Sequence, residues 1–313
     1  MLQFGLTVLL LAYLPTTVAT SCDACKATYA TDKGTAADNP AKCVVLAAYL
    51  TCLETSGKTD AGCPLATADA AAIETDYTAL SCSGESVFTA TCKCQKDFWK
   101  TDQSADTAAV CSAAKAYILC LKGETAVACD TKNTVIGLAT GVETRMTGLG
   151  TTDCAISDSC QCQINTAKAT IDSNANKCTA YDNELSCLRT AQAAGCDGST
   201  TKSAVATATD TARDGLPSGD CAAPTATCQC EINAAKGDAS STTSYCTVLS
   251  TLKTCLSAVA TGTEAGCTTG STQAALVTDT KAKTATAKCG NAADRMTFAL
   301  ASLIVSVLMH LFL

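Results

Sequence analysis

The residues of this 313-residue sequence best suited to chemistry are its 24 cysteines. Thiols can pair as disulfides, bind metal ions as thiolates or act as nucleophiles. The C-x-C pairs, such as Cys92 and Cys94, and the C-x-x-C formed by Cys22 and Cys25 have a spacing found in thiolate metal sites. Long gaps separate the remaining cysteines, however, and the count is even. In a secreted chain this pattern is typical of a disulfide framework.

The cysteines fall into four sets of six, which leaves none over as an isolated nucleophile. The second cysteines of consecutive sets lie 68 or 69 residues apart, and eight residues always separate the third from the fourth. Six cysteines allow fifteen connectivities, so spacing alone leaves the pairing open. The sets are Cys22, Cys25, Cys43, Cys52, Cys63 and Cys82; Cys92, Cys94, Cys111, Cys120, Cys129 and Cys154; Cys160, Cys162, Cys178, Cys187, Cys196 and Cys221; and Cys228, Cys230, Cys246, Cys255, Cys267 and Cys289.

Other catalytic groups are scarce. The only histidine, His310, lies in a C-terminal apolar run that we expect to be removed. Histidine-dependent triads and histidine-ligated zinc are then excluded from the mature chain. The sequence also contains no P-loop, G-x-S-x-G, EF-hand or G-x-G-x-x-G motif. We therefore expect no enzyme activity, no cofactor and no metal site.

Both ends of the chain resemble targeting signals. Residues 1–20 combine an apolar stretch with small residues, which predicts a signal peptide; the alternative is a buried N-terminal helix. At the other end, small residues around Asn291 precede an apolar tail that reaches Leu313. This pattern predicts a glycosylphosphatidylinositol (GPI) attachment signal with lipidation at Asn291, and the alternative is a transmembrane anchor.

The segments that must position the cysteines are rich in alanine, leucine and lysine, which favour helices. Cysteines nine residues apart lie on opposite sides of a helix, so one helix can be linked on both faces. Three glycines that precede fifth cysteines, Gly62, Gly195 and Gly266, predict helix ends. Further helices are predicted at 66–80, 203–213 and 273–283, and a third short helix in the gap between the second and third cysteines. The abundant threonine leaves a β-structure as the alternative.

We therefore predict an all-α fold of four tandem, disulfide-rich modules with six cysteines each, arranged as a rod. The predicted divisions are a signal peptide at 1–20, cysteine repeats at 21–82, 83–154, 155–221 and 222–290, and the attachment site with its removed tail at 291–313.

Two aromatic residues, Trp99 and Phe98, stand near the border of the first and second sets. They predict either a local core or a contact site for a partner. The sequence has no N-x-[ST] acceptor, so any glycans beyond the anchor would be O-linked. Its charge of −7 is spread along the chain without a basic cluster. Nucleic acid is therefore not expected as a partner. The membrane is expected through the lipid, along with self-association or an extracellular protein or glycan.

The composition, the cysteine period and both end signals resemble the surface (immobilisation) antigens of ciliates, which are GPI-anchored coats of cysteine repeats. The C-x-C modules are also similar to those of GDNF receptor alpha chains, which are helical and GPI-anchored. These resemblances imply a cell-surface coat or matrix protein, a glycoprotein on the outer leaflet of the plasma membrane. The alternatives are a ligand-binding co-receptor and a multi-unit protease inhibitor.

Overall fold

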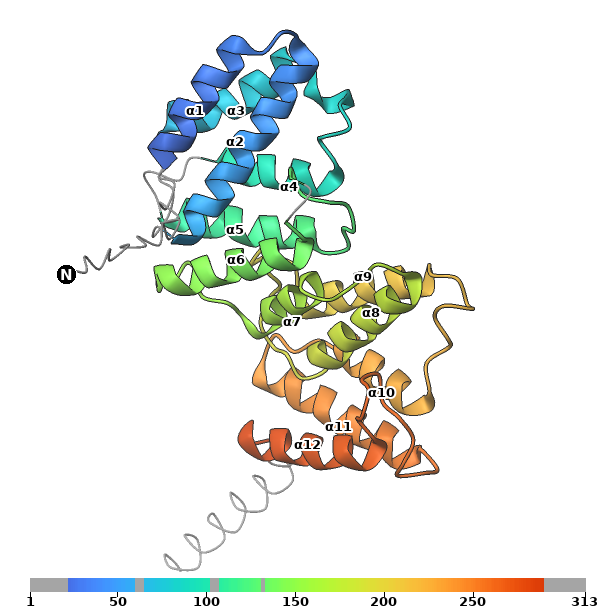
Figure 1. Ribbon diagram of the computed structural model, residues 1–313. Coiled ribbons are helices and arrows are strands. Elements are labelled where there is room, and N and C mark those ends of the chain that lie inside the picture. The colour runs from blue at the N-terminus through green and yellow to red at the C-terminus, as the bar shows by residue number, and fades with distance from the viewer. Residues whose placement is uncertain (1–21, 60–64, 102–106, 131–132, 290–313) are drawn as a thin grey trace, which may run out of the picture.

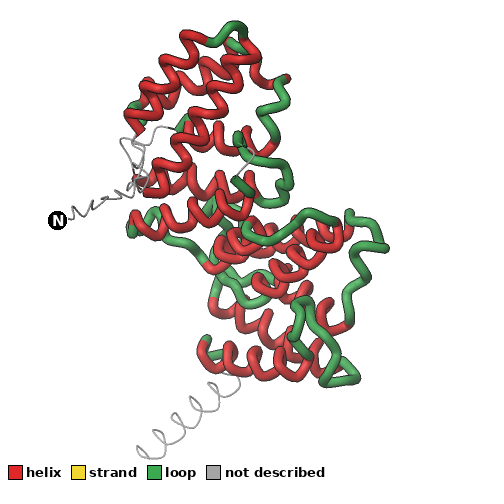
Figure 2. Tube along the Cα trace, viewed as in Figure 1, coloured by secondary structure: helices red, strands yellow, loops and turns green. Residues whose placement is uncertain are grey.

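The computed structural model describes residues 22–59, 65–101, 107–130 and 133–289. Within these ranges the chain forms helices and loops without a strand (Figure 2). The prediction of an all-helical, disulfide-rich fold is confirmed, and the β-structure alternative is wrong for this part of the chain. The helices are α1 (Cys22–Thr35), α2 (Asn39–Thr59), α3 (Thr67–Ala79), η1 (Cys82–Gly84), α4 (Ala90–Trp99), α5 (Thr107–Leu121), α6 (Val135–Leu149), α7 (Asp158–Ala167), α8 (Asn174–Leu188), α9 (Lys202–Asp214), α10 (Ala226–Lys236), α11 (Thr242–Ala258) and α12 (Gln273–Thr286).

Threonine is accommodated in these helices by bonding to the helix backbone. The Thr207 hydroxyl donates to the carbonyl of Ser203 at 2.8 Å, and the Thr211 hydroxyl donates to that of Thr207 at 2.9 Å. Thr140 and Thr144 repeat this contact with the carbonyls four residues earlier. The hydroxyl therefore has a partner inside the helix, and the β-preference of threonine is overridden.

The helices follow one another along an elongated body, from α1 at one end to α12 at the other (Figure 1). Three α-helices lie within each set of six cysteines. The first helix of each later set packs on the second and third helices of the set before it: α4 on α2 and α3, α7 on α5 and α6, and α10 on α8 and α9. The same packing arrangement thus recurs at all three borders between sets.

The apolar core crosses the borders between sets. One cluster includes residues of the first and second sets and extends to Ile164 and Cys196 in the third. A second cluster joins Leu185 and Val205 of the third set to Ile232 of the fourth. The four leucines that follow fourth cysteines, Leu53, Leu121, Leu188 and Leu256, are all fully buried. Because the cores are shared, the division into four modules stays a prediction from the cysteine spacing.

The individual helix predictions agree with the structure in part. The segments 66–80, 203–213 and 273–283 become α3, α9 and α12. The short third helix, however, contains the C-x-C pair itself, as in α7, and ends early in the following gap.

The prediction that the glycines before fifth cysteines end helices is wrong for the two that the structure describes. Helix α8 ends at Leu188 and α11 at Ala258, seven and eight residues before Gly195 and Gly266. A Cβ on Gly195 would stand 2.9 Å from the Oε1 atom of Gln163, and one on Gly266 would stand 2.3 Å from that of Glu231. Glycine is therefore favoured at these two positions by a close approach in the loop. Gly62 lies outside the described residues.

Candidate functional site

The described cysteines all belong to disulfides. In the second, third and fourth sets the first cysteine pairs with the fifth, the second with the fourth, and the third with the sixth. These nine bonds are Cys92–Cys129, Cys94–Cys120, Cys111–Cys154, Cys160–Cys196, Cys162–Cys187, Cys178–Cys221, Cys228–Cys267, Cys230–Cys255 and Cys246–Cys289. The disulfide prediction is confirmed for these residues, and the pairing that spacing left open is resolved.

The first set follows the same order as far as it is described. Cys25 pairs with Cys52, and Cys43 pairs with Cys82. Cys22 is also disulfide-bonded. Cys63 lies outside the described residues. The C-x-x-C at the start of this set is therefore not a pair of free thiolates.

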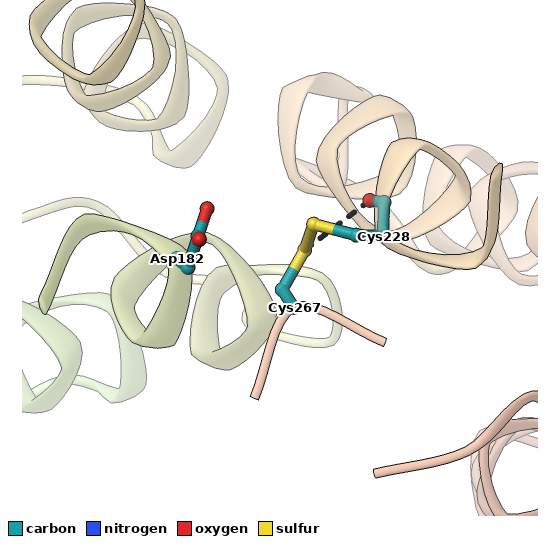
Figure 3. A group of neighbouring side chains, drawn as sticks. All are labelled: Asp182, Cys228 and Cys267. Atoms are coloured by element: carbon teal, nitrogen blue, oxygen red, sulfur yellow. Dashed lines mark hydrogen bonds between the residues drawn. A yellow bond between two sulfur atoms is a disulfide. The ribbon is translucent and has the colours of Figure 1, made fainter. Parts of the chain in front are cut away.

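One carboxylate lies beside two cysteine sulfurs, in a grouping that resembles a metal site (Figure 3). Asp182 stands on α8, and Cys228 and Cys267 belong to the fourth set. The two sulfurs are bonded to each other, so neither is a thiolate that could bind a metal ion. Asp182 instead accepts a hydrogen bond from Nε of Arg213 at 2.5 Å. The group is a structural contact between the third and fourth sets.

The aromatic pair singled out in the sequence is buried. The side chain of Trp99 is 1% exposed and that of Phe98 is 3% exposed. Phe98 stacks on Tyr117, with ring centroids 4.9 Å apart. The indole Nε1 of Trp99 donates to Oε2 of Glu54 at 3.1 Å. The Arg145 guanidinium lies over the rings of Phe98 and Trp99. The contact-site interpretation of Trp99 and Phe98 is therefore wrong, since both belong to the core between the first and second sets.

A recurring hydrogen-bonded frame surrounds each C-x-C pair of the later sets. Thr89, Ser157 and Thr225 each lie three residues before a first cysteine and accept a bond from its N–H, which caps α4, α7 and α10. Each of these hydroxyls also donates, at 2.6 Å, to a carbonyl in the loop before the fifth cysteine. One side chain thus fixes both a helix start and a loop.

The residue directly after each C-x-C completes this frame. Gln95, Gln163 and Glu231 are buried, and each accepts the backbone N–H of the fifth cysteine of its own set at 2.7 Å. Buried acceptors of this kind are needed because an unpaired backbone N–H would be costly in the core. The sequence signal for the frame is [ST]-x-[ST]-C-x-C-[QE], which recurs from residues 89, 157 and 225 and which cysteine spacing alone did not reveal.

A lysine at the end of the first helix of each later set forms an ion pair with the set before it. Lys168 follows α7 and pairs with Glu143 of α6 at 2.7 Å, and Lys236 ends α10 and pairs with Asp210 of α9. At the first junction, Lys100 pairs with Glu74 of α3 at 3.2 Å. The three lysines each lie six residues after a second cysteine. Each border between sets therefore has an equivalent lysine–carboxylate pair as well as equivalent helix packing.

Two deeply buried carboxylates strengthen the later junctions. Glu184 of the third set is 1% exposed and binds Nζ of Lys122 in the second set at 2.6 Å. Burial raises the pKa of Glu184, and Lys122 opposes that shift. Glu231 is 0% exposed and accepts from the Ser186 hydroxyl at 2.5 Å, while Arg189 lies 3.4 Å away. Removing either partner of such a pair would leave the other charge buried and uncompensated, which makes these contacts sensitive to the relative placement of neighbouring sets.

One lysine is also buried at the junction between the third and fourth sets. Lys202 begins α9, is 3% exposed, and donates to the carbonyl of Ala234 in α10 at 2.8 Å. Burial lowers the pKa of Lys202 to about 8, although Asp158 and Asp238 act in the opposite direction. Apart from Asp182 and Arg213, which pair within the third set, the ion pairs described here join one set to the next.

The predictions for the two ends fall outside the described residues. These are the signal peptide at 1–20, the lipidated Asn291 and the removed tail. Among the helices that the structure describes, none is long and apolar enough to cross a membrane.

Comparison with known proteins adds no relative. The chain matches no protein-family model, no curated protein and no solved structure at a significant level.

Proposed function

We propose that this protein is a GPI-anchored, non-enzymatic coat or matrix protein of the cell surface, whose disulfide-linked ectodomain acts as a stiff spacer. The many disulfides fit a secreted or extracellular chain, because oxidising compartments are where such bonds form and persist.

The observation that carries the proposal is the repeated junction. At each of the three borders the first helix of one set packs on two helices of the set before, and a lysine–carboxylate pair spans the border. A chain of domains on flexible linkers would lack such shared cores and buried pairs. Repeated junctions with shared cores produce an extended body that holds its length, which is what a coat or spacer requires.

The surface supports the same proposal. Among the described residues, the large apolar side chains that are exposed are Val44, Val127 and Ile136. The sole tryptophan is buried, and tryptophan is one of the side chains that commonly dominate tight protein interfaces. A surface of this kind favours solubility and resistance over high-affinity recognition.

The anchor is tested by treating intact cells with phosphatidylinositol-specific phospholipase C. We expect the protein to appear in the supernatant, and an Asn291→Leu variant serves as control because leucine is too large for an attachment residue. Failure of the enzyme to release the wild-type protein would contradict the GPI assignment. A transmembrane protein of the same cells should stay in the pellet.

The coat role is tested separately with the released ectodomain. We expect pull-down from cell-surface extracts to recover no single saturable partner, and protease panels to show no inhibition. A stoichiometric partner would favour the co-receptor alternative, and inhibition of one protease at a fixed molar ratio would favour the inhibitor alternative.

A further inference from the structure

The last two helices, α11 and α12, lie at the end of the body farthest from α1 (Figure 1). Residues of both helices and of the chain just after α12 line a pocket. Its volume is about 460 Å³, within the range of small-molecule sites. The residues that line it are Lys253, Lys281, Thr284, Ala285, Lys288 and Cys289. The pocket has no signature in the sequence, because Lys253 is separated from the other two lysines along the chain and only the packing of α11 on α12 brings them together.

The pocket is built on fixed backbone. Lys281, Thr284 and Lys288 recur at helical spacing along one side of α12 and its end. Lys253 lies two turns beyond Cys246 on α11, and Cys246 is joined to Cys289 by a disulfide with Cα atoms 5.4 Å apart. Lys288 has a φ of 54°, and its N–H is bonded to the carbonyl of Ala285 at 3.1 Å. The disulfide therefore holds the end of α12 against the face that carries Lys253.

The charge in this pocket is uncompensated by the described protein. Lys253, Lys281 and Lys288 are exposed and make no side-chain ion pair or hydrogen bond with the described residues. From 242 to 289 the sequence has four lysines and two carboxylates, a balance of +2 in a chain of −7. Both carboxylates are engaged elsewhere: Asp279 pairs with Arg189, and Glu264 accepts the N–H of Thr227.

We propose that this pocket binds a phosphate group, with the ammonium groups of Lys253, Lys281 and Lys288 as its ligands. Three like charges that line one pocket repel one another, and a polyvalent anion converts that repulsion into attraction. Phosphate offers several strong acceptor oxygens, and lysine binds it as a point charge without the planar geometry that arginine needs. The phosphate is either free in solution or carried by the headgroup of an anionic phospholipid. The site is independent of the proposed anchor and coat role, because it rests on the described lysines alone.

The test uses the full chain in a zwitterionic detergent at low ionic strength, titrated with inorganic phosphate by calorimetry. We expect saturable binding by the wild-type protein. The triple variant Lys253→Gln, Lys281→Gln, Lys288→Gln should lose at least about tenfold in affinity, since three charge-assisted contacts are removed. The titration is repeated in mixed detergent micelles that contain phosphatidylcholine alone or equimolar phosphatidylcholine and phosphatidylglycerol. Competition by phosphatidylglycerol identifies the lipid headgroup as the source, and unchanged phosphate binding identifies free phosphate.

Two controls separate a site from general charge. The triple variant Lys42→Gln, Lys93→Gln, Lys177→Gln removes the same charge from other parts of the chain, and Lys283→Gln removes a lysine of α12 that does not line the pocket. Both should bind phosphate as the wild type does. Equal loss in either control, or the absence of saturable binding to both phosphate and phosphatidylglycerol, would overturn the proposal. Circular dichroism verifies that each variant is folded, and the single Lys281→Gln variant serves if the pocket triple is not.

Discussion

The carboxylate of Glu231, a residue with no exposure to solvent, accepts the backbone N–H of Cys267 in a 2.7 Å hydrogen bond. The two residues lie 36 positions apart, yet the bond has counterparts at Gln95 and Gln163. Only Glu231 also accepts a hydroxyl from the neighbouring set, that of Ser186. A single side chain thus links the disulfide frame of the fourth set to its junction with the third.

Replacing Glu231 should therefore reveal both functions of that side chain. Glu231→Ala is expected to lower the free energy of unfolding by about 3 kcal/mol, because the Cys267 N–H and Arg189 lose a buried partner. Glu231→Gln keeps the acceptor found in the other sets and should cost about 1 kcal/mol. Urea unfolding without reductant measures both, and equal effects of the two variants would show that the charge and the acceptor cannot be separated.

The loop glycines should differ in their tolerance of a methyl group. Gly266→Ala places Cβ 2.3 Å from both Glu231 and Ser271 and is expected to cost about 2 kcal/mol. Gly195→Ala should cost about 1 kcal/mol, since the equivalent residue of the second set is already Ala128. The matched control is Gly148→Ala in α6, where nothing stands within 4 Å and helix propensity predicts a gain of up to about 1 kcal/mol. Thermal unfolding midpoints in the reverse order would contradict the packing argument.

Trp99 should behave as a core residue. Trp99→Ala removes a side chain with 1% exposure and is expected to cost about 4 kcal/mol, with reduced secretion. Trp99→Phe retains most of the apolar surface but removes the indole N–H that buried Glu54 accepts, and it should lower the free energy of unfolding by about 2 kcal/mol. Val44→Ala, at a 56% exposed position, provides the control with little change. Normal stability and secretion of Trp99→Ala would contradict the burial.

Lys202 should make stability rise with pH in the mildly alkaline range. Its pKa falls from 10.5 to about 8 on folding, so the unfolded chain binds the proton between those values and the folded chain does not. The free energy of unfolding therefore increases from about pH 8 towards pH 10. A Lys202→Met variant should lack this increase. The comparison stays below pH 10, because the raised pKa values of Tyr29 and Tyr49 make stability fall above that pH. Parallel pH curves for the two proteins would contradict the assignment.

The pairing order predicts the one bond that completes the first set. Since first and fifth cysteines pair in the other three sets, Cys22 is expected to pair with Cys63. Mass spectrometry of peptides from a non-reducing digest at acid pH tests this directly, and any other partner for Cys22 would contradict it.

The cysteine spacing and composition were enough to predict the helical class and the disulfides. The eight-residue gap indicated a helix linked on two faces, and α5 carries Cys111 and Cys120 as expected. The pairing could not be derived, because it depends on which loops return to which helix. The glycines were misassigned because a close approach to Gln163 or Glu231 leaves no local sequence pattern that differs from a helix end.

The candidate sites were harder to predict than the fold. Trp99 and Phe98 stand out in the sequence because aromatic residues are rare in it, but rarity does not distinguish an interface residue from a core residue. The lysine pairs at the junctions and the pocket beside Cys289 depend on helices from different parts of the chain. Their residues are unremarkable in the sequence, since Lys253 and Lys281 become neighbours only after α11 and α12 pack.

The junction pairs also determine how the stack ends. Glu143 and Asp210 each lie nine residues after the threonine that caps the third helix of their set, the second and the third set respectively. Each forms an ion pair with a lysine of the next set. In the fourth set that place is taken by Lys281. A head-to-tail interface of this type is open-ended and would add molecules into a filament if it recurred at its exposed end. A second copy would present its first set at that end, and there Thr31 stands six residues after Cys25 in place of the junction lysine. The lysine–carboxylate pair of the internal borders therefore has no counterpart on either side of such a contact.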